Sequence, residues 1–512
     1  MNTPMSAYIG QVSADGMWLW DGASWQPLVS GSTHQQGPSW LNLNVRATPT
    51  WVALAGALLA GLLTDQALRI GAFGLAASMT VAVGALLLLF TGRLLTAESR
   101  LLAGVGVLFG AWLSARASSW LLWPDLAMAF ALLGLAASLA RSGSLLETGI
   151  AEAAARSIHA LVHVVGGAAF IVRPLRTTRD RLTLLGPLAR GLLIAAPIAI
   201  LLAAMLAAAD PVFASFFNVN FDFGQLVGDA VFVLMGSLTL AGLLRLAAAE
   251  PVSRVNGPVW RLGSIEGLVV LAVLDAIFAA FAVAQAIAAT GAASETLRAA
   301  GTTYADYARS GFFQLLWVAG ITAIVLILFS RITSLTQPNT KRAFLVLGQV
   351  GIGLTLLIVF VAFGRLSLYE EAYGFTMLRL YSHIFAVWIA VVFLLLSADM
   401  AGVFRRRRWF VGATSISAVA VLLALNVVNP EAVVVGLNVD HSRSTHKIDT
   451  QYLAELSSDA TPALLASRSQ LDAALAGDIS RVACAGPKTY SVNPSAFNWS
   501  AAAAASARRQ SC

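Results

Sequence analysis

The stretch LGSIEGLVVLAVLDAIFAAFAVAQAIAA, residues 262–289, decides the fold class of this chain. It carries only two charged side chains, Glu266 and Asp275. About 20 apolar residues in a helix span the hydrocarbon core of a bilayer, so the stretch predicts a transmembrane helix. Asp275 lies near its middle, where an ionised side chain is costly and needs a partner, water or a proton.

Apolar blocks of this kind recur along the 512 residues, which are 58% hydrophobic and 12% charged. A soluble domain carries about 25% charged residues, and a membrane barrel would show short alternating runs instead of long blocks. The sequence therefore predicts an all-α polytopic membrane protein with about 11 transmembrane helices, in a range of 10–12. The blocks are residues 51–63, 71–90, 101–113, 120–140, 191–209, 224–246, 262–289, 311–329, 344–363, 381–396 and 409–428.

Loop charges predict the orientation of these helices. Loops rich in arginine and lysine alternate with the loops 210–223, 290–310 and 364–380, which are poor in them, and the rich loops are expected in the cytoplasm. This scheme places the C-terminus outside the cytoplasm. The net charge of +7 is then a topology signal, because no basic stripe with interleaved aromatic residues indicates nucleic acid binding. The basic residues are Arg173, Arg176, Arg179, Arg181, Arg245, Arg254, Arg261, Arg331, Lys341, Arg342 and Arg405 to Arg408.

Residues 145–172 depart from the apolar pattern. Glu152, Arg156, His159 and His163 recur there at three- and four-residue steps and so follow one face of a helix. Such an amphipathic helix either lies in the membrane interface or crosses with its polar stripe toward the bundle interior. An interfacial helix keeps the preceding arginines on the cytoplasmic side, so we favour it together with a cytoplasmic N-terminus.

Two polar ends flank the multi-helix membrane domain of residues 46–428, and they are a cytoplasmic tail, 1–45, and an extracytoplasmic segment, 429–512. The tail contains DGMWLWDGASW, residues 15–25, in which aromatic residues alternate around an Asp-Gly turn signal. This pattern is typical of a small β-hairpin. The segment resembles the short tryptophan-rich modules with a Trp-Asp-Gly core that precede membrane domains in many Gram-positive and related bacterial proteins. A hairpin held by its aromatic residues, with no ligand, is the alternative.

The C-terminal segment predicts a short helical cap on the bundle. Tyr452, Leu453 and Leu456 have helical spacing, and the segment is too short for a substantial core of its own. Both cysteines of the chain, Cys484 and Cys512, lie in it. An extracytoplasmic location would permit a disulfide between them, and two free thiols are the alternative.

Several segments together resemble a bacterial membrane family, domain of unknown function 4173. They are YADYARSGFFQL at 304–315, YGFTMLRLY at 373–381, NPEA at 429–432 and the stretch 449–465, while DPVF at 210–213 extends the likeness upstream. The resemblance implies many helices in a bacterial cytoplasmic membrane. It implies no established activity, cofactor or catalytic residue.

Polar residues in or near the apolar blocks are the candidates for function. Asp275, Glu266, Asp229 and His383 form a candidate intramembrane polar site, although Glu266 precedes Asp275 by about two and a half turns and faces roughly the opposite side of the helix. The alternative role of these residues is to anchor helix ends. A candidate outer vestibule consists of Asp306, Arg309, Arg365, Glu370, Glu371 and Arg379, and its alternative role is to pair charges between loops.

Metal and cofactor sites are not expected. His159 and His163 have the spacing of a helical metal pair, but no third ligand is identifiable, and the ligand-type residues of 440–449 show no recognised spacing. The sequence also lacks a nucleotide-binding loop, a nucleophile elbow and a Cys-x-x-Cys motif. Nothing in it indicates a soluble catalytic domain.

Three functions are compatible with these features. A non-enzymatic sensor, scaffold or accessory component, with protein partners at the hairpin and the C-terminal segment and the bilayer around it, is the one we favour. A secondary transporter or channel would use Asp275 as an intramembrane acid. A membrane-embedded transferase acting on a lipid-linked substrate would need acids in its first outer loop, which offers only Asp65. Whether the protein is an enzyme stays open.

Overall fold

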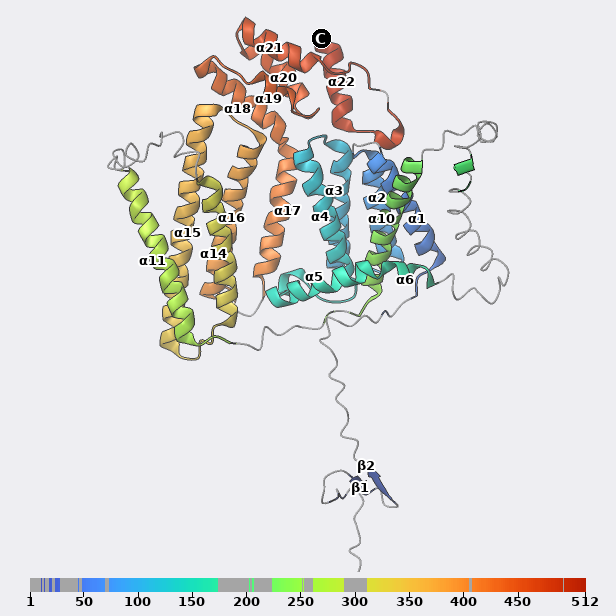
Figure 1. Ribbon diagram of the computed structural model, residues 1–512, viewed down its shortest axis with the longest axis vertical. Coiled ribbons are helices and arrows are strands. Elements are labelled where there is room, and N and C mark those ends of the chain that lie inside the picture. Colours follow the sequence, from blue (N-terminus) through green and yellow to red (C-terminus); the bar gives the residue numbers. More distant parts are fainter. Residues whose placement is uncertain are drawn as a thin grey trace, which may run out of the picture.

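The computed structural model describes residues 11, 13, 18–20, 24–27, 45, 48–69, 73–173, 202, 205, 206, 223–250, 252, 261–289, 311–404, 408–490 and 492–512. Eight helices among them are long and apolar enough to cross a membrane. Large apolar side chains such as Trp317 and Phe360 are 73% and 72% exposed on the outside of these helices, as lipid-facing residues would be. The predicted class, an all-α multi-pass membrane protein, is confirmed. The eight are α1 (Trp51–Arg69), α4 (Ser119–Ser138), α10 (Phe223–Ala248), α11 (Ser264–Ala289), α14 (Phe312–Ile332), α15 (Pro338–Tyr373), α16 (Met377–Ala401) and α17 (Phe410–Val428) (Figure 1).

The predicted number of about eleven spans is not supported by the described residues. Helix α2 (Leu75–Phe90) is apolar but has only 16 residues, and α3 (Ala97–Ala115) is less apolar because its first turn carries Glu98 and Arg100. The block 191–209 lies almost entirely outside the described residues. The blocks that do correspond to spanning helices therefore number eight.

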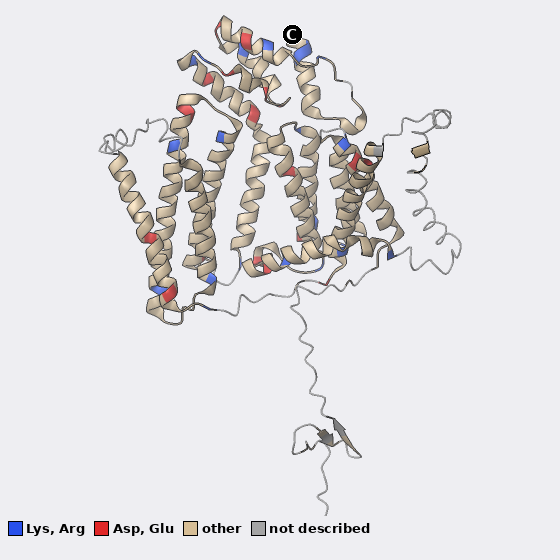
Figure 2. Ribbon diagram, in the orientation of Figure 1, with Lys and Arg blue, Asp and Glu red and all other residues tan. Residues whose placement is uncertain are grey.

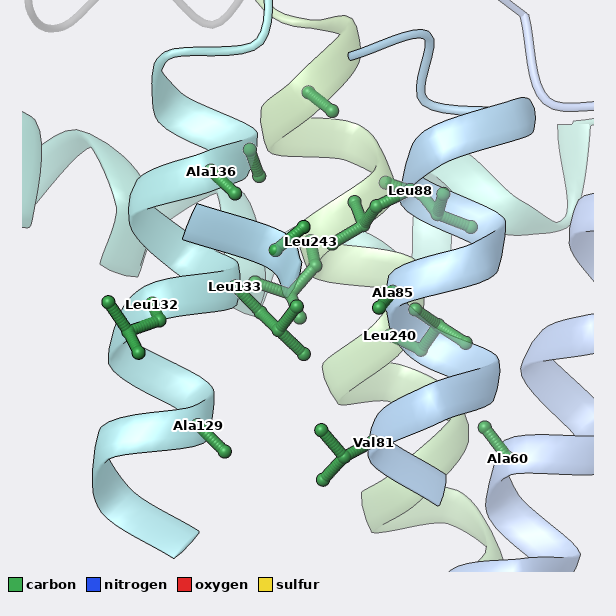
Figure 3. Close-up of a cluster of buried hydrophobic side chains, with 14 of the residues drawn as sticks. Ala60, Val81, Ala85, Leu88, Ala129, Leu132, Leu133, Ala136, Leu240 and Leu243 are labelled. Carbon is green, nitrogen blue, oxygen red and sulfur yellow. The ribbon is translucent and has the colours of Figure 1, made fainter. Parts of the chain in front are cut away.

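The first helix group consists of α1 to α4, α10 and the short helices α5 (Ile150–Val165) and α6 (Gly167–Ile171). Its core forms where Val81 and Leu88 of α2 meet Leu133 of α4 and Leu240 of α10 (Figure 3). Small residues allow the close crossing of α1 and α10, because a Cβ at Gly61 would lie 2.4 Å from the carbonyl oxygen of Val233. Helix pairs in membranes are packed by such small residues, since lipid provides no hydrophobic drive between helices.

The second helix group consists of α11, α14, α15 and α16. Leu326, Phe344 and Phe393 belong to its core and are nearly inaccessible to solvent. Gln349 of α15 accepts a hydrogen bond from the Ser397 hydroxyl at 2.6 Å and donates to the Ser397 carbonyl at 3.0 Å, which ties α15 to α16. Polar bonds of this kind complement van der Waals packing between membrane helices.

Helix α17 joins the two groups. Phe410, at its start, packs in the core of the second group, whereas Leu422, near its end, packs in the core of the first. The indole nitrogen of Trp388 on α16 donates to Ser417 of α17 at 3.1 Å. The groups therefore meet along a seam that α17 occupies (Figure 1).

The polar stripe predicted for residues 145–172 lies on α5, which runs across the ends of the bundle helices instead of along them (Figure 1). Glu152, Arg156, His159 and His163 are all buried against the protein. Arg156 forms an ion pair with Glu152 at 3.0 Å and also donates to the carbonyl of Ser138 at the end of α4. The stripe thus packs under the first helix group, and we call this end of the bundle the α5 end.

The C-terminal segment covers the opposite end, which we call the cap end (Figure 1). Its own small core includes Val435, Leu464 and Ile479. Cys484 and Cys512 are joined as a disulfide with their Cα atoms 5.8 Å apart. The cap is built from α18 (Pro430–Thr445), α19 (Thr450–Ala454), α20 (Thr461–Ser467), α21 (Ala473–Cys484) and α22 (Trp499–Ser511).

Near the N-terminus, two short strands pair antiparallel. They are β1 (Trp18–Trp20) and β2 (Trp25–Pro27), and Trp20 lies opposite Trp25 with ring centroids 5.4 Å apart. Most residues between and around the strands lie outside the described part of the chain.

Candidate functional site

A buried polar cluster lies where the cap meets the bundle. Helix α17 ends at Asn429, which adopts a left-handed conformation with φ of 59°, a region that asparagine tolerates better than most residues. Its side chain caps α18 by accepting from the Ala432 N–H and donates to the Asp459 carbonyl at 2.9 Å. Pro430 then occupies the first turn of α18, where the backbone N–H that proline lacks would have no partner within the helix. This corner places Glu431 between cap and bundle.

Two cap carboxylates hold this junction together. Glu431 is 3% exposed and accepts from the backbone N–H and the hydroxyl of Ser457 at 2.9 and 2.7 Å. Asp459 is 2% exposed and accepts from the N–H groups of Ala117 and Ser118, just before α4, at 3.1 and 2.9 Å. Asp459 therefore fastens the cap to the first helix group.

The bundle contributes a second layer below these carboxylates. Asp125 of α4 is 0% exposed and accepts from the Asn426 amide of α17 at 2.7 Å. Arg116 donates to the Asn426 carbonyl at 2.9 Å, which satisfies the end of α17. Trp120 of α4 and Tyr381 of α16 meet across the seam with ring centroids 5.3 Å apart. Both helix groups therefore reach this cluster.

A cavity of about 440 Å³ opens between these parts. Sites for small molecules have volumes of roughly 300–1,000 Å³. The start of α4, the start of α16 and the cap each supply part of the wall. The polar residues that line it are Ser119, Thr376, Glu431, Tyr452, Glu455 and Ser457.

The electrostatics of the cavity follow from burial. Burial raises the pKa of Glu431, the hydroxyls of Ser118 and Ser457 oppose that shift, and the nearby charge of Asp459 adds to it. Burial likewise raises the pKa of Tyr452, whose phenol oxygen accepts from the Met377 N–H at 2.6 Å. The cavity therefore combines a carboxyl group removed from water with an exposed one, Glu455.

Asp275 lies in the packed interface between α11 and α15. It is 7% exposed, and neither carboxylate oxygen has a hydrogen-bond partner among the described residues. A Cβ at Gly351 would lie 2.8 Å from one of these oxygens, so glycine makes room for the carboxylate. Glu266 is exposed in the first turn of α11 and accepts from the Gly263 N–H at 2.8 Å. The structure therefore does not bring Glu266 to Asp275.

Asp229 and His383 lie apart from Asp275 and from each other. Asp229 of α10 pairs with Arg69 at 2.7 Å in the first helix group. His383 of α16 lies 3.2 Å from Glu370 through Nδ1 and 3.2 Å from the Ser367 hydroxyl through Nε2. The order Ser367, His383, Glu370 resembles the nucleophile, base and carboxylate of a catalytic triad. Ser367, however, lies inside helix α15, and its hydroxyl donates to the Phe363 carbonyl. Backbone N–H groups inside a helix are already bonded and cannot form an oxyanion hole.

The residues of the predicted outer vestibule take separate positions. Asp306 and Arg309 lie outside the described residues. Arg365 donates to Gln285 of α11 at 3.3 Å. Arg379 donates to the carbonyls of Tyr373 and Gly374 and stacks on Tyr369, with 4.2 Å from its guanidinium carbon to the ring centroid. Glu370 is buried beside His383, and Glu371 is exposed. Arg365, Arg379 and Glu370 thus contact their own helix ends and neighbours.

Sequence reasoning missed the junction cluster. Asp125 lies within the apolar block 120–140, so the rule that singled out Asp275 could have found it. Glu431 and Asp459 lie in segments used for the family resemblance, but no local spacing marks them as neighbours.

Comparison with known proteins gives one match. No curated protein sequence matches the chain, and no solved structure matches it. A family model matches residues 103–467, which run from α3 into the cap and include Asp125, Glu431 and Asp459. The matching family is not the one numbered 4173, and that resemblance is not confirmed. The match leaves out the tryptophan-rich strands and the disulfide. Since it covers well over half of the 512 residues, the chain belongs to the family described as Domain of unknown function (DUF4153).

Proposed function

We propose that the protein is a membrane sensor whose cavity at the cap end binds a small cationic molecule. The observation that carries this proposal is the composition of the cavity wall, which joins the cap to the starts of α4 and α16 around the buried Glu431. An occupant of this cavity touches both helix groups and the cap at once. Its binding energy can therefore change how these three parts are held together.

The lining residues favour a positive ligand. Glu431 and Glu455 supply two carboxylates, and the lining described by the structure includes no lysine or arginine. Trp120 and Tyr452 add aromatic surface, which attracts an ammonium group through the negative face of the ring. An amine or quaternary ammonium of modest size fits this chemistry.

The effect of ligand binding would be transmitted through hydrogen bonds that already connect the cap, α17 and the two helix groups. Asp459 connects the cap to the start of α4, and Asn426 connects α17 to Asp125 of α4. The phenol oxygen of Tyr452 accepts from the backbone at the start of α16. A ligand that shifts α19 and the turn after it, which carries Asp459, would therefore act on α4 and α16 together. This role needs no catalytic group.

The orientation that we propose has the cap outside the cytoplasm and α5 in the cytoplasmic interface of a bacterial cytoplasmic membrane. Figure 2 shows charged residues gathered at the helix ends and in the cap, with few along the middles of the helices. Arg156, Arg245, Arg331 and Arg408 lie at the α5 end, which fits the positive-inside rule.

We also propose eleven crossings, made by the eight long helices, by α2 and α3, and by the apolar block 191–209. Helix α6 lies at the α5 end, because a Cβ at Gly167 would be 2.5 Å from the Gly242 nitrogen near the end of α10. Helix α10 begins 19 residues before Gly242, about 28 Å away at 1.5 Å per residue. Helix α6 and the start of α10 therefore lie at opposite ends of the bundle, which supports one further crossing between them. The sequence places the apolar block 191–209 there, and this block lies almost entirely outside the described residues.

Calorimetric titration of the purified full chain with choline, ethanolamine and putrescine tests the sensor proposal. We expect saturable binding of at least one of them, with a dissociation constant raised about tenfold or more in Glu431→Gln, since loss of a buried charge partner is worth roughly 1.4 kcal/mol or more. The amide oxygen introduced by this substitution would still accept from Ser457. Glu371→Gln removes an exposed carboxylate at the same end and should bind as the wild type does. Absence of saturable binding, or an unchanged constant in Glu431→Gln, contradicts the proposal.

A secondary transporter is the second candidate, and Asp275 is the observation that favours it. A buried carboxylate without a hydrogen-bond partner in the described part of the chain is typical of intramembrane proton or ion sites. Proton flux into liposomes containing the protein would be lost in Asp275→Asn if this candidate is right. Equal flux from both proteins, with choline binding retained, would favour the sensor.

A further inference from the structure

A second cavity, of about 740 Å³, lies at the α5 end. The start of α5, the last turns of α14, the end of α16 and the start of α17 form its walls. It thus lies at the seam between the two helix groups, at the opposite end from the cavity under the cap. No residue lines both cavities.

The walls of this cavity are mostly apolar and open toward the side of the bundle. Ile324 and Leu328 of α14 line it and are 67% and 49% exposed, and Phe404 is 70% exposed. Since α14 is one of the spanning helices, Ile324 and Leu328 lie at the depth of the lipid chains. The cavity is therefore open to lipid.

Two arginines mark the end of the cavity farthest from the cap. Arg331 lies in the last turn of α14 and pairs with Asp399 at 2.8 Å. Arg408 lies just before α17, is 50% exposed, and is 4.0 Å from Glu152, which Arg156 already holds at 3.0 Å. The charged residues in the wall are Arg331, Arg408 and Asp399, which gives a net charge of +1.

A glycine brings Arg408 to this position. A Cβ at Gly149 would lie 3.0 Å from Cδ and 3.2 Å from Nη1 of Arg408. The arginine therefore lies directly against the backbone before α5. Its guanidinium stays at the level of the helix ends, where lipid phosphates lie.

We propose that this cavity binds one anionic phospholipid. Its phosphate would lie between Arg331 and Arg408, and an acyl chain would run along Ile324, Leu328 and Val411. A zwitterionic lipid would bring its own cation to a wall of net charge +1, so the anionic lipid is preferred. Basic pockets between membrane helices on the cytoplasmic side hold anionic headgroups for the same reason.

Native mass spectrometry of the full chain in detergent tests the proposal, with phosphatidylglycerol and phosphatidylcholine of equal chain length as probes. We expect one phosphatidylglycerol to be retained about fivefold more strongly than phosphatidylcholine. This ratio corresponds to the attraction that roughly one arginine adds for an anionic headgroup. Arg408→Gln should lose this preference and Arg408→Lys should keep most of it. Ala154→Trp, which fills the apolar wall, should weaken both lipids.

The control is Arg342→Gln, which removes an exposed arginine at the start of α15 outside the cavity lining and should leave retention unchanged. Glycerophosphoglycerol, the headgroup without chains, should not displace the lipid. Equal retention of both lipids, wild-type retention in Arg408→Gln, or displacement by the headgroup alone would each overturn the lipid proposal. A midpoint of thermal unfolding equal to that of the wild type checks that each variant is folded.

Discussion

The amide nitrogen of Asn426 on α17 lies 2.7 Å from Oδ1 of Asp125 on α4, and both side chains are fully buried. This bond closes the seam near the cap end, because α4 belongs to the first helix group while α17 also packs against the second. Arg116 holds the Asn426 carbonyl at the same point. Buried hydrogen bonds thus hold the seam together next to the cavity under the cap.

Asn426→Ala should lower the free energy of unfolding by about 1–3 kcal/mol, because it leaves a buried carboxyl group without its donor. Chemical unfolding of the purified protein in mixed micelles measures the change. Val427→Ala, at a site that is 70% exposed on the same helix, should change it far less. Asp125→Ala combined with Asn426→Ala should destabilise less than the sum of the two, and strict additivity would show that the bond contributes nothing.

The close crossing of α1 and α10 gives a second prediction. A Cβ at Gly61 would lie 2.2 Å from the Ser237 hydroxyl and 2.4 Å from a backbone oxygen, which cannot rotate away. Gly61→Ala should therefore push the helices apart and lower the free energy of unfolding by about 1–3 kcal/mol.

Gly228→Ala is the matched control for this change, because nothing lies within 4 Å of the Cβ that it adds to α10. It should be neutral or stabilise the protein by up to about 1 kcal/mol through helix propensity. Unfolding of both variants in the same micelles compares them. A Gly61→Ala protein as stable as Gly228→Ala would mean that α1 and α10 are not in contact at this glycine.

The membrane class was predictable because it depends only on block length and charge content, which every span displays locally. The described residues support fewer spans than predicted, because hydropathy places α2 and α3 at the borderline: one is short, and the other begins with Glu98 and Arg100. The sequence favoured an interfacial position for α5 but did not determine which way its polar stripe faces. A polar stripe can face lipid headgroups or the bundle, and only packing against Ser138 decides for the bundle.

The junction cluster was harder to predict because its partners are distant in the chain. The donor at Ser118 is 341 residues from Asp459, and it is a backbone N–H, which leaves no trace in residue identity. Asp125 is different, since an acid inside an apolar block is visible locally. The predicted residues Asp275, Asp229 and His383 were selected by that local rule, and the fold distributes them over separate contacts.

The buried Glu431 predicts a pH dependence. Its pKa is raised by burial, so between the ordinary value of 4.5 and the higher folded value the folded protein binds more protons than the unfolded chain. Stability falls with rising pH wherever that holds. The midpoint of thermal unfolding should therefore decrease as pH rises above about 4.5 and level off above the folded pKa.

Glu431→Gln should flatten this part of the curve while keeping the acceptor for Ser457. Glu371→Gln should retain the slope of the wild type, because Glu371 is exposed. Scanning fluorimetry from pH 4 to 9 compares the three proteins. A Glu431→Gln curve as steep as that of the wild type would assign the slope to other groups.

The disulfide of the cap gives the last prediction. Cys484 and Cys512 are 28 residues apart, and closing a loop of this length stabilises the folded state by about 3–4 kcal/mol in the chain-entropy account. The bond holds α22 to the end of α21, and Arg508 of α22 donates to the Ala483 carbonyl beside it at 2.8 Å. Replacing both cysteines by serine should therefore release α22 first and leave the membrane helices folded. Limited proteolysis should then cut between residues 485 and 498 at lower protease concentration than in the wild type. Equal cleavage of both proteins, or two alkylatable thiols in the unreduced wild type, would show that the cap is held by its apolar core alone.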